Sequence, residues 1–170
     1  MPEISAEDVI LRKRKNWPET CTPIADLMIR LYRVRDLVYE YSRRHVKQEF
    51  GLTRAEFEVV VTMRTVEAPY RLTPTQLQKA LLITPGGITK VLHNLERRGL
   101  ITRSRDSSDG RTRAVKLTPK GIELAEAVLP MVLEDCKQQL SLGLDAAQMR
   151  ELSKLLRAAL KGLEGPPKRG

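Results

Sequence analysis

Two short helices joined by a tight turn are the feature that most constrains how this chain can fold. Thr73-Pro74 opens the stretch "PTQLQKALL", and Thr84-Pro85 opens a second helical stretch that continues to Arg98. Threonine followed by proline is a typical helix start, because the threonine oxygen caps a free backbone N–H group and proline has no N–H to leave unpaired. Two such starts separated by only a few residues predict a helix-turn-helix.

A β-hairpin is predicted directly after the second of these helices. Gly99 is placed to end that helix, since glycine readily adopts the left-handed conformation found at helix C-termini. The segments "LITRSRD" and "RTRAVKL" then alternate apolar and polar residues, and "SSDG" between them favours a turn. We therefore expect a mostly α fold, a winged helix-turn-helix with a two-stranded β-hairpin wing.

Long amphipathic helices are expected on both sides of the winged helix-turn-helix. Apolar residues recur at steps of three and four over residues 22–50, and again in two helices within residues 118–163. These apolar faces are too extensive for one small domain to bury. We therefore expect long N- and C-terminal dimerisation helices that pack against a second copy. In such a two-fold dimer, the second helices of the two helix-turn-helix pairs would lie about 34 Å apart.

The chain is expected to hold one main domain. Residues 1–21 form an N-terminal extension with a short helix from about Ser5 to Lys15, residues 22–163 form a single domain, and residues 164–170 form a tail. Within the domain, Thr53 caps a helix expected over about 54–67, and the winged helix-turn-helix occupies about 52–121.

The second helix of the pair has one apolar and one polar face. Ile88, Val91, Leu92 and Leu95 recur at helical spacing and are expected in the core. The opposite face can donate hydrogen bonds to phosphates and to base edges. The residues of this helix expected to contact DNA are Thr84, Gly86, Gly87, Thr89, Lys90, His93 and Arg97.

Gly86 and Gly87 stand in the first turn of this helix, although each costs roughly 1 kcal/mol of helix stability against alanine. They leave the helix N-terminus bare, where free N–H groups and the helix dipole attract phosphate. The alternative is that "PGG" is a loose turn and that the basic face is only solvated.

The predicted wing tip, "RSRDSSDGRTR", is rich in arginine. Arginine at the tip of a hairpin suits insertion into a narrow minor groove, while aspartate there can brace an arginine or form a turn. The alternative is an ordinary charged hairpin. The wing residues expected at the DNA are Arg105, Asp109, Arg111 and Arg113.

The chain is basic, with a formal net charge of +9 and a sequence pI of about 9.8. This excess favours an anionic partner, such as nucleic acid or an acidic membrane surface. Together with the predicted winged helix, it makes double-stranded DNA the expected partner. No apolar run approaches the ~20 residues of a membrane span, so no membrane partner is expected. The first residues, "MPEISAEDVILRKRKN", lack the apolar region of a signal peptide, and we expect a cytoplasmic protein.

Residues that would support catalysis or a cofactor are scarce. Cys21 and Cys136 lie far apart without a zinc-binding spacing, and are expected to be reduced thiols. No Ser-His-Asp set, pair of carboxylates or metal motif stands out, so the sequence predicts no enzyme, no cofactor and no metal site. The residues themselves leave two kinds of winged-helix protein open: one that binds nucleic acid without a ligand, and one that responds to oxidation of a thiol.

Over roughly residues 52–121 the sequence resembles the MarR family of winged-helix transcription regulators. The motifs that carry the resemblance are Leu95-Glu96, Gly99-Leu100, the tip Asp109-Gly110-Arg111 and the exit from Leu117-Thr118 to Gly121. The resemblance implies a homodimer formed by the first and last helices. It also implies that Arg111 enters the minor groove with Asp109 holding it, and that a small anionic ligand releases a repressor from DNA.

The stretch "PTQLQKALLITPGGITK" is also similar to the urate-responsive, PecS-type branch of that family. That resemblance implies a pocket for a small aromatic or heterocyclic anion such as urate, at positions matching Trp17, Glu58, Lys90 and Arg103. Glutamate replaces the branch's aspartate and lysine replaces one arginine, which changes a forked donor into a point donor. The alternative roles are packing of the extra helix for Trp17, an exposed acid for Glu58, a phosphate contact for Lys90 and a wing-base contact for Arg103.

Overall fold

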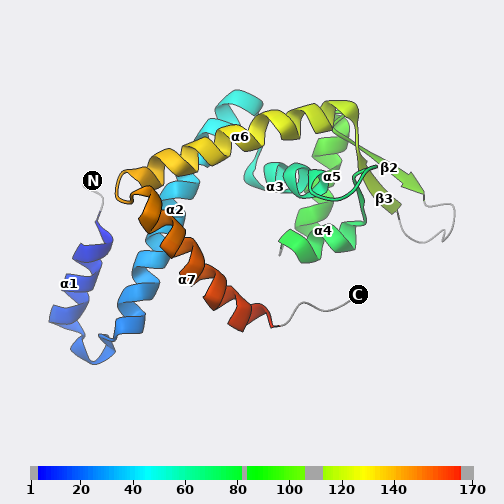
Figure 1. Cartoon of the computed structure of the whole chain (residues 1–170). Coiled ribbons are helices and arrows are strands. Elements are labelled where there is room, and N and C mark those ends of the chain that lie inside the picture. The colour runs from blue at the N-terminus through cyan, green and yellow to red at the C-terminus, as the bar shows by residue number, and fades with distance from the viewer. Residues whose placement is uncertain (1–3, 82–83, 106–112, 166–170) are drawn as a thin grey trace. The chain divides into compact units, whose positions relative to one another are not determined.

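The structure is a computed structural model that describes residues 4–81, 84–105 and 113–165 (Figure 1). Its elements are α1 (Ala6–Asn16), the 3-10 helix η1 (Pro18–Thr20), α2 (Pro23–Phe50), α3 (Arg54–Arg64), β1 (Arg71–Leu72), α4 (Pro74–Leu81), α5 (Pro85–Arg97), β2 (Ile101–Arg105), β3 (Arg113–Leu117), α6 (Pro119–Ser141) and α7 (Ala146–Glu164). The predicted fold class, a mostly α winged helix-turn-helix between long helices, is confirmed.

The chain divides into two compact units. The helical unit comprises Met1–Val38 with Glu134–Gly170, and the winged-helix unit comprises Tyr39–Leu133. Helices α2 and α6 each continue from one unit into the other. The predicted division into an extension, one domain and a tail remains a prediction.

Local capping decides where most helices begin. Complete capping boxes open α1, α3 and α7, in which the cap side chain and the side chain of the third helical residue bind each other's backbone N–H groups. The Thr-Pro starts are confirmed as well: the Thr84 hydroxyl accepts from the Gly87 N–H at 3.3 Å, and the Thr118 hydroxyl from the Gly121 N–H at 3.1 Å. The prediction is less accurate for the end of α3, which stops at Arg64 and not near residue 67.

One continuous core holds the winged-helix unit together. Helix α5 contributes Ile88, Leu92 and Leu95, each at most 3% exposed, while Val91 is only partly buried. The core also contains apolar side chains of α3, α4, α6 and the sheet, among them Val59, Val60, Met63, Leu77, Val115 and Val128. Burying a side chain of this size contributes about 1.5–3 kcal/mol, so this core fixes α5 against the rest of the unit.

The sheet has three strands and not the two that the sequence predicts. The hairpin of β2 and β3 is confirmed, and β1 pairs antiparallel with the other edge of β3, in the order β1-β3-β2. The predicted two-stranded wing is therefore incomplete. Strand β1 is only Arg71–Leu72, which is too short to show an alternating pattern, and its pairing with Val115 and Lys116 is not local.

The start of α6 lies very close to the end of α5. A Cβ placed on Gly121 would come within 2.1 Å of the Leu100 carbonyl oxygen, so this position has no room for a side chain. The Thr118 N–H donates to the same oxygen at 3.1 Å. The first turn of α6 is thereby fixed next to the segment that links the second helix of the pair to the wing.

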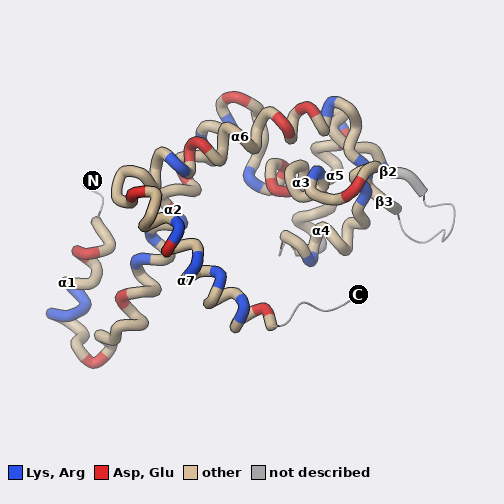
Figure 2. The backbone as a smooth tube through the Cα atoms, viewed as in Figure 1, with Lys and Arg blue, Asp and Glu red and all other residues tan. Residues whose placement is uncertain are grey.

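In the helical unit, α1 lies alongside the N-terminal part of α2. Two ion pairs join them: Arg30 Nε to Glu7 Oε1 at 2.8 Å, and Arg14 Nη2 to Asp26 Oδ2 at 2.7 Å. Acidic residues stand at the start of α1 and basic residues at its end (Figure 2), an arrangement that complements the helix dipole.

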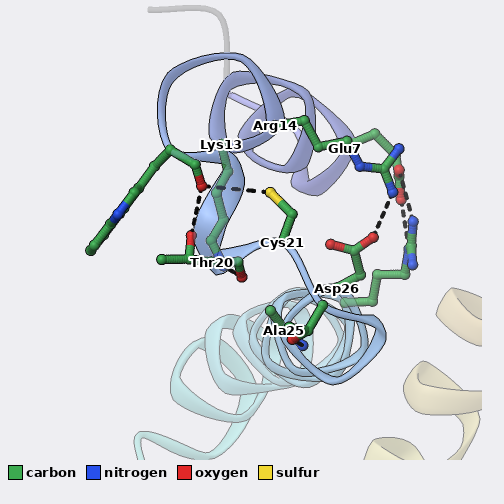
Figure 3. Close-up of polar contacts among 10 residues, drawn as sticks. Glu7, Lys13, Arg14, Thr20, Cys21, Ala25 and Asp26 are labelled. Carbon is green, nitrogen blue, oxygen red and sulfur yellow. Dashed lines mark hydrogen bonds and ion pairs between the residues drawn. The ribbon is translucent and has the colours of Figure 1, made fainter.

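The turn between α1 and α2 is closed by side chains. Lys13 Nζ donates to the Thr20 carbonyl at 2.9 Å, and the Cys21 thiol donates to the Trp17 carbonyl at 3.7 Å (Figure 3). The predicted N-terminal helix is thus confirmed as α1, and Trp17, its C-cap residue, remains 63% exposed.

The apolar faces of α2 and α7 are exposed in the single chain. Side chains on α2 are 41–60% exposed at Ile24, Leu27, Leu31, Val34 and Leu37, and those on α7 are 42–83% exposed at Leu155, Leu156, Leu160 and Leu163. Ile10 is the only buried apolar side chain among the described residues of the helical unit. The prediction that the long helices have more apolar surface than their own chain covers is therefore confirmed.

Candidate nucleic-acid interface

Helix α5 presents a polar face away from the core. Thr89, Lys90, His93 and Arg97 are exposed, and Gly86 is exposed one turn before them. These positions recur at steps of three and four, so they form one stripe along the helix. Their part in DNA contact stays a prediction.

The N-terminus of α5 is open at Gly86. Nothing among the described atoms lies within 4 Å of a Cβ placed there, and the backbone is helical. Neither packing among the described residues nor backbone conformation therefore requires a glycine at this position, where alanine would favour the helix. A surface that approaches from outside the chain would account for it.

The two wing strands lead to the predicted arginine-rich tip. The register pairs Arg105 with Arg113, so the last residue of β2 lies opposite the first residue of β3. Asp109 and Arg111 lie outside the described residues, as do the side chains of Arg105 and Arg113. The four predicted wing contacts remain predictions.

Arg103 joins the base of the wing to the last turns of α5. Its Nε lies 3.1 Å from Glu96 Oε2, and its side chain is 23% exposed. The distance is that of an ion pair, but Nε makes no hydrogen bond with the described atoms, so the angle is poor. Arg103 therefore lies at the base of the wing, and its ligand role and its alternative role as a wing-base contact both stay predictions.

Glu58 is held by two neighbours in the winged-helix unit. Its Oε1 accepts from the Tyr39 hydroxyl at 3.0 Å and from Arg54 Nε at 2.9 Å. The Arg54 guanidinium also lies over the Tyr39 ring, 4.1 Å from its centre. Burial, and then the negative charge of Glu58, raise the pKa of Tyr39, so this phenol stays protonated and keeps donating to the carboxylate.

The four residues predicted to bind a ligand do not form one cluster within a single unit. Glu58 and Arg103 have separate charged partners, Arg54 and Glu96, and Lys90 is exposed on α5. Trp17 belongs to the helical unit. The ligand set therefore stays a prediction.

Arg98 is a residue of functional interest that the sequence analysis did not select. Its guanidinium donates to the carbonyls of Phe50 and Gly51 at the end of α2. In a helical projection Arg98 falls on the same face as Val91 and Leu95, which is the core face. A cation at a core-face position is the sequence signal that could have identified it.

The described residues contain neither a cluster of potential metal ligands nor a helix able to cross a membrane. Within residues 4–81, 84–105 and 113–165, no group of three or more His, Cys, Asp or Glu is placed to hold a metal. Cys21 and Cys136 are both partly buried, and neither forms a disulfide within the described residues. No helix in the described ranges combines the length and the apolar character needed to cross a membrane.

A helix pair whose second helix has an exposed polar face, followed by an arginine-rich hairpin, defines the winged helix-turn-helix class. A family model described as MarR family matches residues 50–112. The multiple antibiotic resistance protein MarR of Escherichia coli is 31% identical over 109 residues, which are 64% of this chain and 74% of that protein. The chain therefore belongs to the MarR family of transcription regulators, a family of regulators and not of enzymes.

Two further relatives match at similar levels. An uncharacterized HTH-type transcriptional regulator of Bacillus cereus is 33% identical over 104 residues, which cover 61% of this chain and 66% of the relative, just under two thirds of its length. The HTH-type transcriptional regulator PecS of Dickeya dadantii is 27% identical over 138 residues, 81% of this chain and 82% of PecS.

Solved structures agree with the fold. The apo form of Escherichia coli MarR superposes with a TM-score of 0.70 at 26% identity, covering 82% of this chain and 98% of that one. A mutant of the same protein in complex with operator DNA superposes with a TM-score of 0.63 at 27% identity, covering 82% of this chain and 99% of that one. Bordetella bronchiseptica BpsR, whose DNA binding is regulated by 6-hydroxynicotinic acid, superposes with a TM-score of 0.62 at 25% identity. The match covers 76% of this chain and 98% of BpsR.

Proposed function

We propose that the protein binds a pseudo-palindromic DNA operator as a homodimer and represses transcription from it. The observation that carries this proposal is the exposed polar face of α5, with an N-terminus left open at Gly86. Backbone N–H groups and the helix dipole at that end attract phosphate, and the residues behind it can read base edges. A net charge of +9 favours the encounter with DNA, and a protein that acts on such an operator works in the cytoplasm.

The homodimer is supported by the exposed apolar faces of α2 and α7. Leu27 on α2 is 56% exposed and Leu160 on α7 is 49% exposed, and neither helix has an apolar partner of matching extent among the described residues of its unit. Exposed apolar stripes of this kind are characteristic of a surface that another chain covers. A two-fold axis would double each contact and present two α5 helices to successive turns of the duplex.

An in vitro selection tests the DNA-binding proposal. The full chain is used to enrich duplexes from a random-sequence pool, and the selected duplex is then footprinted. We expect an inverted repeat whose half-sites lie about 10 base pairs apart, centre to centre. Enrichment of no sequence, or protection of a single half-site by a monomer, would contradict the proposal.

We further propose that a small aromatic or heterocyclic anion releases the repressor, with urate as the first compound to test. The support is the similarity to PecS, together with a family neighbour, BpsR, that is regulated by a heterocyclic acid. Trp17 offers a flat stacking face, while Lys90 and Arg103 offer positive charge. Glu58 would repel an anion unless Arg54 screened it, so ligand binding would alter the Glu58–Arg54 ion pair.

A titration with two readouts tests the ligand proposal. Urate is added to wild type, Trp17→Phe and Arg103→Ala, and binding is followed without DNA by calorimetry and with DNA by release of the selected duplex. We expect both variants to bind urate more weakly than wild type. Equal binding by all three proteins would remove this residue set. Release by an oxidant and not by any anion tested would favour the thiol-responsive alternative.

A further inference from the structure

Arg98 ties the C-terminal end of α5 to the C-terminal end of α2. Its Nη2 donates to the Phe50 carbonyl at 2.8 Å, and its Nη1 donates to the Gly51 carbonyl at 3.0 Å. The last carbonyls of a helix have no partner within the helix, and a cation there is favourable to the helix dipole. One guanidinium therefore satisfies two backbone groups at the end of α2.

The geometry of this contact favours arginine over lysine. Gly51 ends α2 with a φ of 62°, a left-handed conformation that turns its carbonyl away from the helix axis. The planar fork of Arg98 reaches both the Phe50 and the Gly51 carbonyls, whereas a lysine ammonium is a single point donor on a flexible chain. The identity of residue 98 thus determines how rigidly the two helix ends are joined.

A buried acid stands beside the same guanidinium. Glu56 is 4% exposed, and its Oε2 lies 3.9 Å from Arg98 Nη1. The same oxygen accepts from the backbone N–H of Thr53 at 2.8 Å and from the Thr53 hydroxyl at 3.0 Å. Arg98 therefore sits at the corner where α2 ends and α3 begins, beside the capping box of α3.

The backbone around Arg98 is also tied to the start of α6. Lys120 Nζ donates to the Arg98 carbonyl at 3.2 Å, and the Thr118 hydroxyl donates to the Gly99 carbonyl at 2.7 Å. The C-terminal end of α5 is therefore attached to both long helices that continue into the helical unit. At its N-terminal end, no described atom lies within 4 Å of a Cβ placed on Gly86.

We propose that Arg98 is a positioning residue that makes the direction of α5 depend on α2 and α6, and hence on the geometry of the dimer. This role rests on the dimeric operator binding proposed above. Two half-sites are bound together only if both α5 helices point correctly. Loss of the Arg98 contacts should therefore reduce discrimination between operators of different half-site spacing, while the contacts of α5 with phosphate remain.

The experiment compares Arg98→Gln with Arg97→Gln in the full chain. Both changes remove one positive charge per subunit at neighbouring positions. The Arg97 side chain is exposed on the predicted DNA face and makes no hydrogen bond or ion pair with the described residues. Affinity is measured for the selected duplex and for a duplex with one base pair inserted between the half-sites, each over a range of salt concentrations.

We expect opposite signatures. Arg98→Gln should lower the ratio of affinities for the two spacings roughly tenfold, within the usual range of coupling between sites, and leave the salt dependence unchanged. Arg97→Gln should keep the ratio and make the slope of log affinity against log salt shallower by about 1 per subunit. Arg98→Lys should lie between wild type and Arg98→Gln, because it keeps the charge and loses the fork.

Two further measurements keep the test decisive. Thermal unfolding and sedimentation show whether Arg98→Gln is folded and dimeric. If it is not, the Arg98→Lys variant decides, since it keeps the charge and the stem but loses the fork that binds both carbonyls. A folded Arg98 variant that discriminates spacing as wild type does would overturn this role. A salt slope that falls in Arg98→Gln as in Arg97→Gln would make Arg98 a phosphate contact. Wild-type protein that ignores spacing would instead refute the proposed dimeric operator.

Discussion

The two compact units of the chain bury their apolar side chains to different extents. In the winged-helix unit, Leu92 and Leu95 of α5 are at most 1% exposed, whereas in the helical unit Leu27 of α2 and Leu156 of α7 are 56% and 42% exposed. All these helices are amphipathic with the same period, so periodicity alone does not distinguish a face buried within the chain from one that needs another chain. The winged-helix unit carries its own core, while the helical unit exposes apolar faces that the proposed dimer would cover.

Charging the exposed face of α7 should have the largest effect. Leu156 and Leu160 line an apolar groove of about 910 Å³ with Leu140, Met149 and Leu152. Leu156→Glu with Leu160→Glu should dissociate the dimer, because each substitution acts twice across a two-fold axis. We expect operator affinity to fall at least ~1,000-fold, which corresponds to about 4 kcal/mol. Sedimentation equilibrium and a binding titration measure the two effects.

The matched control places the same charges on the opposite side of α7. Ala147 and Ala158 are exposed and lie about half a turn away from the Leu156 face in a helical projection. Ala147→Glu with Ala158→Glu should leave the dimer and its operator affinity unchanged. If the leucine double variant also stays dimeric and binds the operator normally, the dimer does not use this face of α7. The exposed apolar face would then not distinguish the helical unit from the winged-helix unit in the way described above.

A smaller but clear difference is expected from equal truncations in the two units. Leu95→Ala removes a fully buried side chain and should lower the free energy of unfolding by about 2–5 kcal/mol at any protein concentration. Leu27→Ala should lower the free energy of unfolding only slightly in dilute protein. The loss should grow with protein concentration as the dimer forms, because the cavity would exist only at the interface. Urea denaturation at several protein concentrations separates the two. A concentration-independent loss for Leu27→Ala would show that its packing lies within one chain.

Much of the fold could be predicted because its signals are local. Each Thr-Pro start and each capping box depends on residues three positions apart, which is why the start of α5 after Thr84 and that of α6 after Thr118 are correct. Strand β1 could not be predicted, because its two residues pair with Val115 and Lys116, far along the chain. The same reason hid Arg98, whose partners at Phe50 and Gly51 are distant in sequence.

The candidate site also combines features that local sequence predicts with contacts that it does not. The exposed stripe on α5 follows from helical periodicity and is present as expected, with His93 and Arg97 facing solvent. The Arg54–Glu58 ion pair follows from i,i+4 spacing within α3, so the sequence could have revealed it. The Tyr39–Glu58 hydrogen bond and the Arg103–Glu96 ion pair depend on how α2 packs on α3 and β2 on α5, so no sequence spacing reveals them. A resemblance to relatives transfers positions but not the contacts around them, and these contacts decide whether a charge is available to a ligand.

Replacing Gly86 in the winged-helix unit should have modest effects of opposite sign, a gain in stability and a loss in operator affinity. Gly86→Ala should raise the free energy of unfolding by about 0.5–1 kcal/mol, since space is available and alanine favours a helix. It should also weaken operator binding, because the methyl group would keep the backbone away from phosphate. Thr84→Ala serves as a comparison, since loss of the cap should cost about 1 kcal/mol. Operator affinity that is unchanged in Gly86→Ala would mean that the glycine is not needed at the DNA.

The smallest effect is expected where α1 meets α2 in the helical unit. The hydrogen bonds from Arg30 lower the pKa of Glu7 below its ordinary value of 4.5. A carboxyl group whose pKa is lowered on folding contributes stability above its unfolded pKa and loses that contribution as the pH falls through its folded pKa. The attachment of α1 should therefore be complete at neutral pH and weaken below about pH 4.5. Both partners are exposed, so the change should be slight and should shrink further in high salt.

Tryptophan fluorescence measures this attachment, because Trp17 is the only tryptophan in the chain and caps the end of α1. Wild type should show a small fluorescence change between pH 5 and pH 3 that Glu7→Gln lacks, since the amide cannot titrate. Glu19→Gln, an exposed acid of η1, is the control and should keep the wild-type profile. The Arg14–Asp26 ion pair remains in Glu7→Gln, so α1 should stay helical in circular dichroism at pH 7. If the fluorescence–pH profiles of wild type and Glu7→Gln superimpose, Glu7 does not hold α1 against α2. Other contacts along α2 would then be responsible for the attachment of α1.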